Sequence, residues 1–343
     1  MNIEKAIYKR VGPVKKLFSL GITAIRILPN GDIIVGTGEG KLAKLSIQNM
    51  QLVAQEEVMG AITSFTFTGD YAHFFCGTSQ SNIYWVNAAK LTPELRNTCH
   101  YERINDVAFP YGYSEVFATA SMNEIRIWNA TNRQELLRIQ VPGVECNCVF
   151  FNRDGKSIIS GWSDGKIRCF LPQSGKLLYV INDAHNHGCT AITATDDGQR
   201  IISGGSEGDV RVWKITKQTQ AMEASLKEHR GRVWSIELNA DNTQAISSSA
   251  DGSCIIWDIK NYTRVICLFE STAFRQASFN PEEYQILTTG SDRKITYWEK
   301  YDGQIIRSVE GSDKELNSLV ITREGKHFLS GGQDGILKLW NYD

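Results

Sequence analysis

The sequence predicts an all-β fold in which one four-stranded unit is repeated eight times. Three observations carry this prediction. A large residue that closes a strand recurs every 41 to 44 positions, the residues around it alternate between apolar and polar, and a turn position stands six residues before it. Alternation with period two is typical of strands, not of helices. Because a row of such units buries its sheet faces by stacking into a closed ring, we predict a β-propeller.

The recurring large residue sets the register of the units. Its eight copies are Leu45, Val86, Trp128, Phe170, Trp213, Trp257, Trp298 and Trp340. We expect this residue to be buried at the end of the third strand, where it anchors its blade; the anchors predicted in this way are Trp128, Phe170, Trp213, Trp298 and Trp340. The units then cover approximately residues 20–58, 60–102, 103–140, 143–182, 187–226, 229–269, 272–309 and 312–343.

The turn column provides a second test of this register. Six residues before the anchors stand Glu39, Gln80, Met122, Asp164, Glu207, Asp251, Asp292 and Asp334. The last five are acidic, and Asp in particular favours tight turns. Only the third unit, with Met122, is degenerate, so the register holds along the chain.

The two ends of the chain predict how the ring closes. Residues 5–10 read as an outer strand, and the last unit ends on its third strand. We therefore expect residues 5–10 to supply the missing fourth strand, which removes an exposed sheet edge. The ring then has seven or eight blades. In an alternative arrangement, units one and two belong to a preceding propeller.

Composition excludes several classes of protein. The 343 residues carry 37 Lys and Arg against 38 Asp and Glu, a net charge of −1. That balance does not indicate a protein that binds nucleic acid or an anionic membrane. No stretch approaches the roughly 18 to 20 apolar residues needed to cross a bilayer, and the N-terminus lacks the apolar core of a signal peptide. We expect a soluble cytoplasmic protein whose eight cysteines are reduced thiols.

No catalytic constellation is present in the sequence. It contains no phosphate-binding Gly-Lys-Ser/Thr loop, no Gly-x-Ser-x-Gly elbow and no His-Glu-x-x-His pair. We therefore predict no enzyme, no catalytic residue, no cofactor and no small-molecule substrate.

Two cysteine-containing segments resemble metal sites at first sight. His185, His187 and Cys189 are of the types that bind zinc, but no second Cys/His pair stands nearby in the sequence. Cys146 and Cys148 lie on one face of a strand, as any pair of core residues would. We predict no metal site, and we expect His187 to be a structural histidine of unit five.

The repeat resembles the WD-repeat family, which carries Gly-His before the first strand, an Asp turn, and Trp-Asp closing the third strand. The fullest copy is unit six. There His229, Ser249, Asp251 and Trp257 occupy the positions at which the family builds a structural hydrogen-bonded tetrad. Other units depart from the pattern, and units one and two lack the tryptophan.

Several passages outside the repeat consensus resemble a family of cilia- and flagella-associated WD-repeat proteins. They include Lys16-Leu17-Phe18-Ser19-Leu20-Gly21, Val107-Ala108-Phe109-Pro110-Tyr111-Gly112 and Phe279-Asn280-Pro281-Glu282-Glu283-Tyr284. The resemblance implies a non-enzymatic scaffold of motile cilia or flagella. Its expected place is inside the doublet microtubules of the axoneme, in contact with tubulin and neighbouring inner proteins. Members of that family are about twice as long, with two propellers in tandem.

A soluble adaptor, such as a ubiquitin-ligase substrate receptor, is the alternative function. Such propellers often carry Trp-Asp-x-Arg after the third strand. The nearest match here is the segment 257–260, in which Lys260 replaces the arginine. Lysine lacks the planar fork of arginine, which weakens this alternative.

Two further sets of residues are candidates for contacts. Tyr111 and Tyr113 are aromatic residues in a predicted loop and are candidate partner contacts. A basic residue stands two positions before the anchor in four units, at Arg126, Arg168, Arg211 and Lys338. We expect the stems of these basic side chains to pack between blades and not to form a stripe that binds anions.

Overall fold

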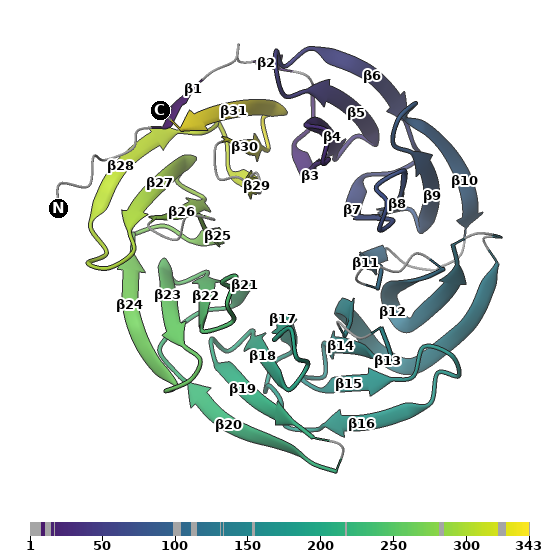
Figure 1. The fold of residues 1–343 in the computed structure, drawn as a ribbon, viewed down its shortest axis with the longest axis vertical. Coiled ribbons are helices and arrows are strands. Elements are labelled where there is room, and N and C mark those ends of the chain that lie inside the picture. The colour runs from purple at the N-terminus through teal and green to yellow at the C-terminus, as the bar shows by residue number, and fades with distance from the viewer. Residues whose placement is uncertain are drawn as a thin grey trace.

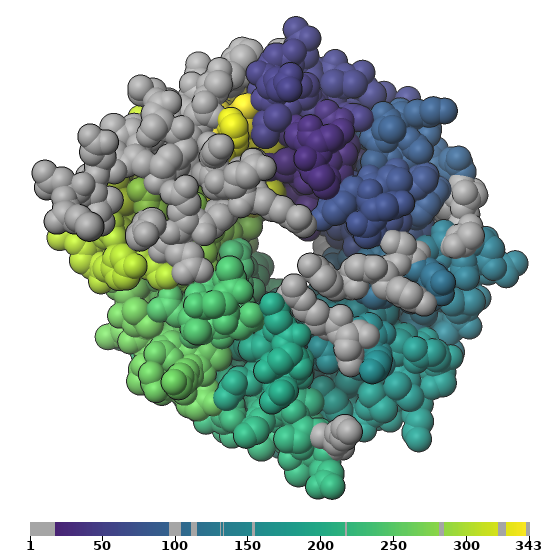
Figure 2. All heavy atoms as spheres, viewed as in Figure 1, coloured from purple at the N-terminus to yellow at the C-terminus, as the bar shows by residue number. Residues whose placement is uncertain are grey.

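The strands are arranged as a ring around a central opening (Figure 1, Figure 2). The structure, a computed structural model, describes residues 8–10, 15–16, 18–98, 104–110, 115–130, 132, 134–152, 155–216, 218–280, 285–321 and 327–342. Within these ranges every helix or strand element is a strand. The predicted all-β propeller is therefore confirmed.

Each unit runs outward from the central opening through its four strands. Unit one contains β3 (Ile22–Ile27), β4 (Asp32–Thr37), β5 (Lys41–Ser46) and β6 (Leu52–Glu57), and unit two contains β7 (Ile62–Phe67), β8 (His73–Thr78), β9 (Asn82–Asn87) and β10 (Thr92–Thr98). Units three and four share β11 (Ile104–Ala108), β12 (Val116–Asn129), β13 (Glu135–Phe151), β14 (Ile158–Trp162), β15 (Ile167–Phe170) and β16 (Leu177–Ile181).

The second half of the ring repeats this arrangement. Unit five contains β17 (Cys189–Ala194), β18 (Arg200–Gly205), β19 (Val210–Ile215) and β20 (Gln220–Leu226), and unit six contains β21 (Val233–Leu238), β22 (Gln244–Ser249), β23 (Ser253–Asp258) and β24 (Thr263–Phe269). Unit seven contains β25 (Phe274–Phe279), β26 (Gln285–Gly290), β27 (Lys294–Glu299) and β28 (Ile305–Glu310). Unit eight contains β29 (Leu316–Ile321), β30 (His327–Gly332) and β31 (Ile336–Tyr342), beside β1 (Tyr8–Arg10) and β2 (Lys15–Lys16).

These strands form seven hydrogen-bonded sheets, one of which holds two repeat units. In the six-stranded sheet, residues 118–121 of β12 pair with β11 and residues 122–128 pair with β13, so β12 doubles back near Asn123. A backbone hydrogen bond from the Ala130 N–H to the Glu115 carbonyl, 2.8 Å long, closes that hairpin. β13 crosses between the two units, because residues 135–140 pair with β12 and residues 146–151 pair with β14. By strand pairing, the seven sheets thus carry eight repeat units, seven with four strands and unit eight with five.

Backbone geometry supports this register in every unit. The residue after the turn column has a positive φ in all eight copies, at Gly40, Ser81, Asn123, Gly165, Gly208, Gly252, Arg293 and Gly335. Five of the eight are glycine, which adopts this conformation without a steric penalty. Unit three keeps the turn because Asn123 tolerates the left-handed region, although its turn column holds Met122.

The ring closes where unit eight meets unit one. β1 pairs antiparallel with β31, and β29 packs against β3. A Cβ placed on Gly331 of β30 would lie 2.6 Å from Cγ2 of Ile22, so the absence of a side chain at Gly331 lets the two units approach closely. The side-chain amide of Asn317 also donates a hydrogen bond to the Ile22 carbonyl across the same junction, at 3.0 Å.

The hydrophobic core is distributed around the ring. Clusters of buried residues lie between neighbouring units; one of them joins Ile22 and Ile25 of unit one to Leu329 and Leu337 of unit eight. Each unit therefore depends on its neighbours to bury its sheet faces.

Candidate functional site

The polar network of unit six links a tryptophan, a serine, a histidine and an aspartate. Trp257 Nε1 donates to Ser247 Oγ at 2.8 Å, and Nε2 of the fully buried His229 side chain lies 2.7 Å from the same hydroxyl. The prediction of Ser249 as the serine of this network is wrong. Its hydroxyl donates to the Gly231 carbonyl at 2.9 Å.

Strand register explains this correction. Residues 247 and 249 lie on the same face of β22, because side chains alternate along a strand. Trp257 pairs with Ala245, so its indole reaches the hydroxyl two residues along, on Ser247, and not the one four residues along. The choice between the two serines therefore depends on a pairing that the sequence pattern did not supply.

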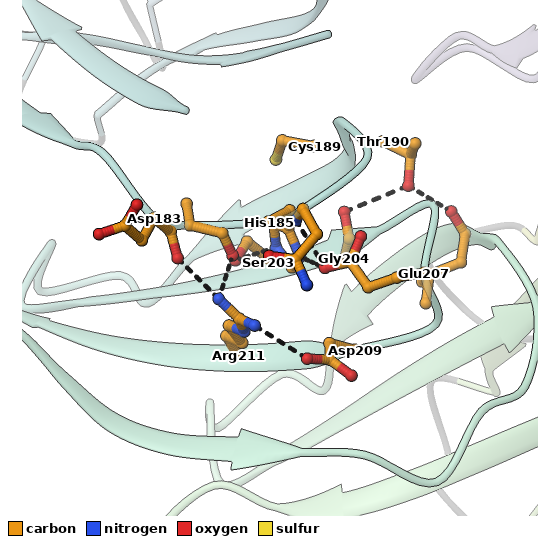
Figure 3. A network of polar contacts seen from close by, with 12 residues as sticks. Asp183, His185, Cys189, Thr190, Ser203, Gly204, Glu207, Asp209 and Arg211 are labelled. Atoms are coloured by element: carbon orange, nitrogen blue, oxygen red, sulfur yellow. Dashed lines mark hydrogen bonds and ion pairs between the residues drawn. The ribbon is translucent and has the colours of Figure 1, made fainter. Parts of the chain in front are cut away.

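Unit five contains a second network of the same kind, shown in Figure 3. Nε2 of His185 lies 2.8 Å from Ser203 Oγ, which accepts a 2.9 Å hydrogen bond from Trp213 Nε1, and His185 Nδ1 lies 2.7 Å from Glu207. The structural histidine is therefore His185, which is buried. The expectation that His187 fills this role is wrong, because His187 is exposed.

The carboxylates of these networks are held in their charged form. Burial alone raises the pKa of Glu207, but hydrogen bonds from His185 and from backbone N–H groups outweigh it and lower the pKa to about 2. The same balance holds the pKa of Asp251 well below its ordinary value, through the nearby His229 imidazole and through hydrogen bonds from the Arg230 N–H and from Ser253. Both carboxylates are therefore structural acceptors.

The anchor tryptophans of the other units also bind a hydroxyl on the second strand. The indole Nε1 of Trp128 donates to the Thr119 hydroxyl at 2.9 Å. In the same way, Trp298 donates to Thr288 at 2.8 Å and Trp340 donates to Ser330 at 3.0 Å. Unit four has Phe170 at the anchor, and there the indole of Trp162 donates to Ser160 at 2.8 Å. Each of these anchors is buried.

The unit five network has the connectivity of a hydrolase triad, because Ser203 contacts His185, which in turn contacts Glu207. Its chemistry is different. Ser203 is 0% exposed, and its hydroxyl oxygen already accepts the Trp213 indole N–H. A nucleophile must reach its substrate, so this arrangement provides packing and rigidity and not acyl transfer.

The candidate metal ligands do not converge. Among the residues that the structure describes, no three His, Cys, Asp or Glu side chains are grouped so that they could hold a metal ion. Cys146 and Cys189 are buried, and burial raises the pKa of the Cys146 thiol. A hydrogen bond with Cys148 is the main cause that raises the pKa of Cys189. Cys146 belongs to the hydrophobic cluster of units three and four, and Cys189 belongs to the cluster between units four and five.

The predicted column of basic residues is occupied by contacts within the molecule. Arg126 lies 2.6 Å from Glu124, and Arg168 lies 2.6 Å from Asp164. Arg211 binds Asp209 at 2.9 Å and two backbone carbonyls (Figure 3), and Lys338 donates to the Glu310 carbonyl at 3.1 Å. The charged heads, and not only the stems, are therefore used in the structure.

Other predicted features are located as follows. Tyr111 and Tyr113 lie outside the described residues. In the segment 257–260, Ile259 is buried and Lys260 is exposed. No helix in the described part of the chain is long and apolar enough to cross a membrane.

One set of contacts that joins neighbouring units was not predicted from the sequence. In each of these contacts, a side chain near the start of a unit's first strand donates a hydrogen bond to a backbone carbonyl of the next unit. Asn105 donates to Cys146 at 2.9 Å, Asn147 to Cys189 at 2.8 Å and Thr190 to Val233 at 2.7 Å. Asn317 repeats the contact across the ring closure. A recurring Asn or Thr at this register position was the available signal.

Comparison with known proteins agrees with this geometry. The family model described as WD domain, G-beta repeat matches residues 139–170, 175–214, 221–258 and 303–341. The chain belongs to the WD-repeat family. A computationally designed protein whose crystal structure carries the name Ika8 covers 94% of the chain at a TM-score of 0.81, with 97% of its own chain covered. The two sequences are 19% identical, so this likeness supports the fold alone.

Several relatives of this WD-repeat chain share a name. Cilia- and flagella-associated protein 52 of Chlamydomonas reinhardtii is 48% identical over 99% of the chain, and those of Mus musculus and Homo sapiens are 46% and 45% identical over 100% of it. The predicted resemblance is therefore confirmed, and the predicted location in a cilium or flagellum is supported. The chain spans 56% of the length of each of these three relatives.

Proposed function

We propose that this WD-repeat chain is a non-enzymatic structural scaffold of motile cilia or flagella. In this proposal it lies inside the doublet microtubules of the axoneme, where it binds tubulin and neighbouring inner proteins. The single observation that carries the proposal is the 45 to 48% identity to cilia- and flagella-associated proteins over nearly the whole chain.

The rigidity of the ring supports a scaffold role. Buried hydrogen bonds fix the anchor tryptophans, and side-chain contacts such as Asn147 to the Cys189 carbonyl join one unit to the next. A rigid ring presents two broad faces and an outer rim, which suits a protein that contacts several partners at once. A net charge of −1 favours recognition by shape over bulk attraction to the acidic microtubule surface.

The state of the polar groups supports a role without catalysis. Ser203, His185 and Glu207 are used in a buried network, and three of the four basic residues in the column before the anchors bind carboxylates. Groups that could act as nucleophile, base or anion binder are thus engaged in holding the fold together.

We further propose that all eight units form one domain, with units one and two in the same ring as units three to eight. The close approach of Gly331 to Ile22 and the hydrogen bond from Asn317 to the Ile22 carbonyl support a single ring. The N-terminal strand on β31 supports it as well.

Fractionation of axonemes tests the scaffold proposal. We would tag the protein in a ciliated cell, extract axonemes with detergent and high salt, and treat the remaining doublets with protease. A motor protein that high salt releases serves as the extraction control. Retention together with shielding from protease is the expected result. Release into the soluble fraction contradicts the proposal and favours the adaptor alternative.

A further inference from the structure

Three cavities adjoin on one face of the ring, the face that carries the turns between first and second strands. A cavity of about 560 Å³ lies between units two and three, one of about 270 Å³ between units one and two, and one of about 430 Å³ between units eight and one. Tyr71 borders all three cavities, and Arg26, Leu28 and Pro29 each border two. We call these three cavities around Tyr71, taken together, the Tyr71 groove.

The walls of the Tyr71 groove combine apolar and polar residues, and the two smaller cavities are the more apolar ones. Phe65, Phe67 and Phe109 line its largest cavity, and Ile47 and Val320 line the cavity toward unit eight. Pockets with apolar and aromatic walls and a few polar groups are the usual form of a binding site.

One positive charge in the groove, that of Arg26, forms no salt bridge with a carboxylate among the residues that the structure describes. Arg26 lines two of the cavities, and its one hydrogen bond within the described part of the chain goes to the carbonyl of its neighbour Ile25, at 2.8 Å. Asp106 borders the same cavity, but its carboxylate accepts the backbone N–H groups of Val107 and Val149 at 2.9 and 3.0 Å. Asp106 is close enough to interact electrostatically with Arg26 but forms no salt bridge with it, so the guanidinium keeps hydrogen-bond donors for an anionic group from outside.

The position of Tyr71 is costly for the backbone. Its φ is +56°, in the left-handed region that bulky residues seldom adopt. The equivalent residue of this turn is Gly31, Gly155, Gly198 or Asn242 in four other units, all of which tolerate that region better. The Tyr71 ring lies beside Phe67, with ring centroids 5.9 Å apart. The chain thus places an aromatic ring at the junction of three cavities, where a glycine would satisfy the turn.

We propose that the Tyr71 groove binds an extended peptide segment of a partner protein in which one Asp or Glu is flanked by apolar residues. The carboxylate pairs with the Arg26 guanidinium, whose planar fork matches a carboxylate in two hydrogen bonds. The flanking apolar side chains enter the cavities on either side of Tyr71. Arginine and tyrosine are among the residues that dominate binding energy at protein interfaces.

This inference does not depend on the proposed place of the chain in the doublet. Peptide binding is measured on the isolated chain, whereas the scaffold proposal is tested on axonemes. Either one can fail while the other holds.

The test begins with a displayed library of short random peptides, selected on the immobilised full chain. The leading peptide is then synthesised in two forms, one with its acidic residue and one with the matching amide, and both are measured by fluorescence anisotropy. We expect the enriched peptides to carry one Asp or Glu between apolar residues. We expect the acidic form to bind at least about tenfold more tightly than the amide form.

Three variants locate the binding site. Arg26→Gln is expected to abolish the difference between the two peptide forms. Tyr71→Asn is expected to weaken both forms while the chain stays folded, because Asn242 occupies the same turn position in unit six. The control is Arg232→Gln, at an exposed arginine that stacks on Trp234 just before β21 and hence at the opposite end of the first strands.

Several results would overturn the proposal. These are a selection that enriches no peptide, enrichment of basic or wholly apolar peptides, and an affinity that Arg26→Gln and Tyr71→Asn leave unchanged. Equal loss of binding in Arg232→Gln also contradicts it, because that result places the peptide elsewhere. Melting curves of the three variants confirm that each loss is measured on folded protein.

Discussion

The Glu207 carboxylate lies 2.7 Å from Nδ1 of His185, whereas the Asp251 carboxylate lies 3.8 Å from Nδ1 of His229. Glutamate is one methylene longer and reaches the histidine directly. In unit six, Ser253 Oγ stands between the two groups, 2.5 Å from the His229 nitrogen and 2.6 Å from the Asp251 oxygen. The two units therefore build the same buried network from different residues.

Removal of the bridging hydroxyl in unit six is expected to destabilise the ring. Ser253→Ala separates Asp251 from His229 and leaves a buried imidazole N–H without its acceptor. We expect the free energy of unfolding to fall by about 1 to 3 kcal/mol in chemical denaturation.

Ser206→Ala is the matched control, because the Ser206 hydroxyl has no hydrogen-bond partner among the residues that the structure describes, and the Ser206 N–H donates to the Gly188 carbonyl. The control should change stability by less than about 0.5 kcal/mol. Equal effects of the two substitutions would show that the Ser253 bridge contributes nothing.

The anchor tryptophan of unit six contributes both packing and a hydrogen bond. Trp257→Ala is expected to cost about 3 to 5 kcal/mol through the cavity that it leaves. Trp257→Phe keeps much of the volume but loses the donor to Ser247, so it should cost about 1 to 3 kcal/mol. Calorimetric melting compares the two variants. A shift near zero for the alanine variant contradicts the anchor role of Trp257.

Much of the architecture follows from local pattern. Period-two alternation and the repeated anchor predict the strands and their order, because each unit repeats the same local physics. The pairing partner of a given hydroxyl is a different matter. Ser247 and Ser249 lie on one face of β22, and only the pairing of Ala245 with Trp257 decides which serine meets the indole. In unit five, His185 and His187 likewise differ by two positions, and the loop path decides which of them is buried.

The Tyr71 groove lay beyond sequence reasoning for a related reason. Its lining comes from four units, and no local pattern indicates that Arg26 and Tyr71 border the same cavities. The left-handed φ of Tyr71 could not be predicted from the sequence either. The corresponding turns carry glycine or asparagine, so a tyrosine does not indicate this conformation.

Closure of the ring between units eight and one is open to a direct test. Gly331→Ala places a Cβ 2.6 Å from Cγ2 of Ile22, so we expect a loss of about 1 to 3 kcal/mol in stability. Gly38→Ala is the control, since its Cβ would meet nothing nearer than 3.6 Å and Gly38 has no positive φ.

The comparison is made by thermal denaturation of the full chain. If Gly331→Ala melts like Gly38→Ala, unit eight does not pack on unit one. That result would favour the arrangement in which units one and two belong to another propeller.

The buried Glu237 side chain is expected to make the free energy of unfolding depend on pH. Burial raises its pKa to about 7, against hydrogen bonds from Ser278 and the Phe279 N–H that lower it. The pKa of Glu237 in the folded state lies above its value in the unfolded state. Below the unfolded value the carboxyl is protonated in both states, and the contribution of the proton to stability is fully present. The contribution of Glu237 to stability is then lost as the pH rises from about 4.5 toward 7.

Glu237→Gln removes this titration. Between about pH 5 and pH 8, the native protein should lose stability relative to the variant as the pH rises. Melting temperatures of the two proteins across this range provide the measurement. A constant difference between them would show that Glu237 does not titrate there. Below this range Glu207 and Asp251, whose pKa values are lowered, govern acid unfolding in both proteins.

We propose above that this WD-repeat chain is a structural component of the doublet microtubule. Cryo-electron tomography of axonemes from cells with and without the protein tests it most directly, with re-expression as the control. The account predicts that a ring-shaped density on the inner wall of the doublet disappears with the protein and returns when it is re-expressed. Doublets that are identical in the two cell lines, or a loss of density only outside the doublet, would contradict the account.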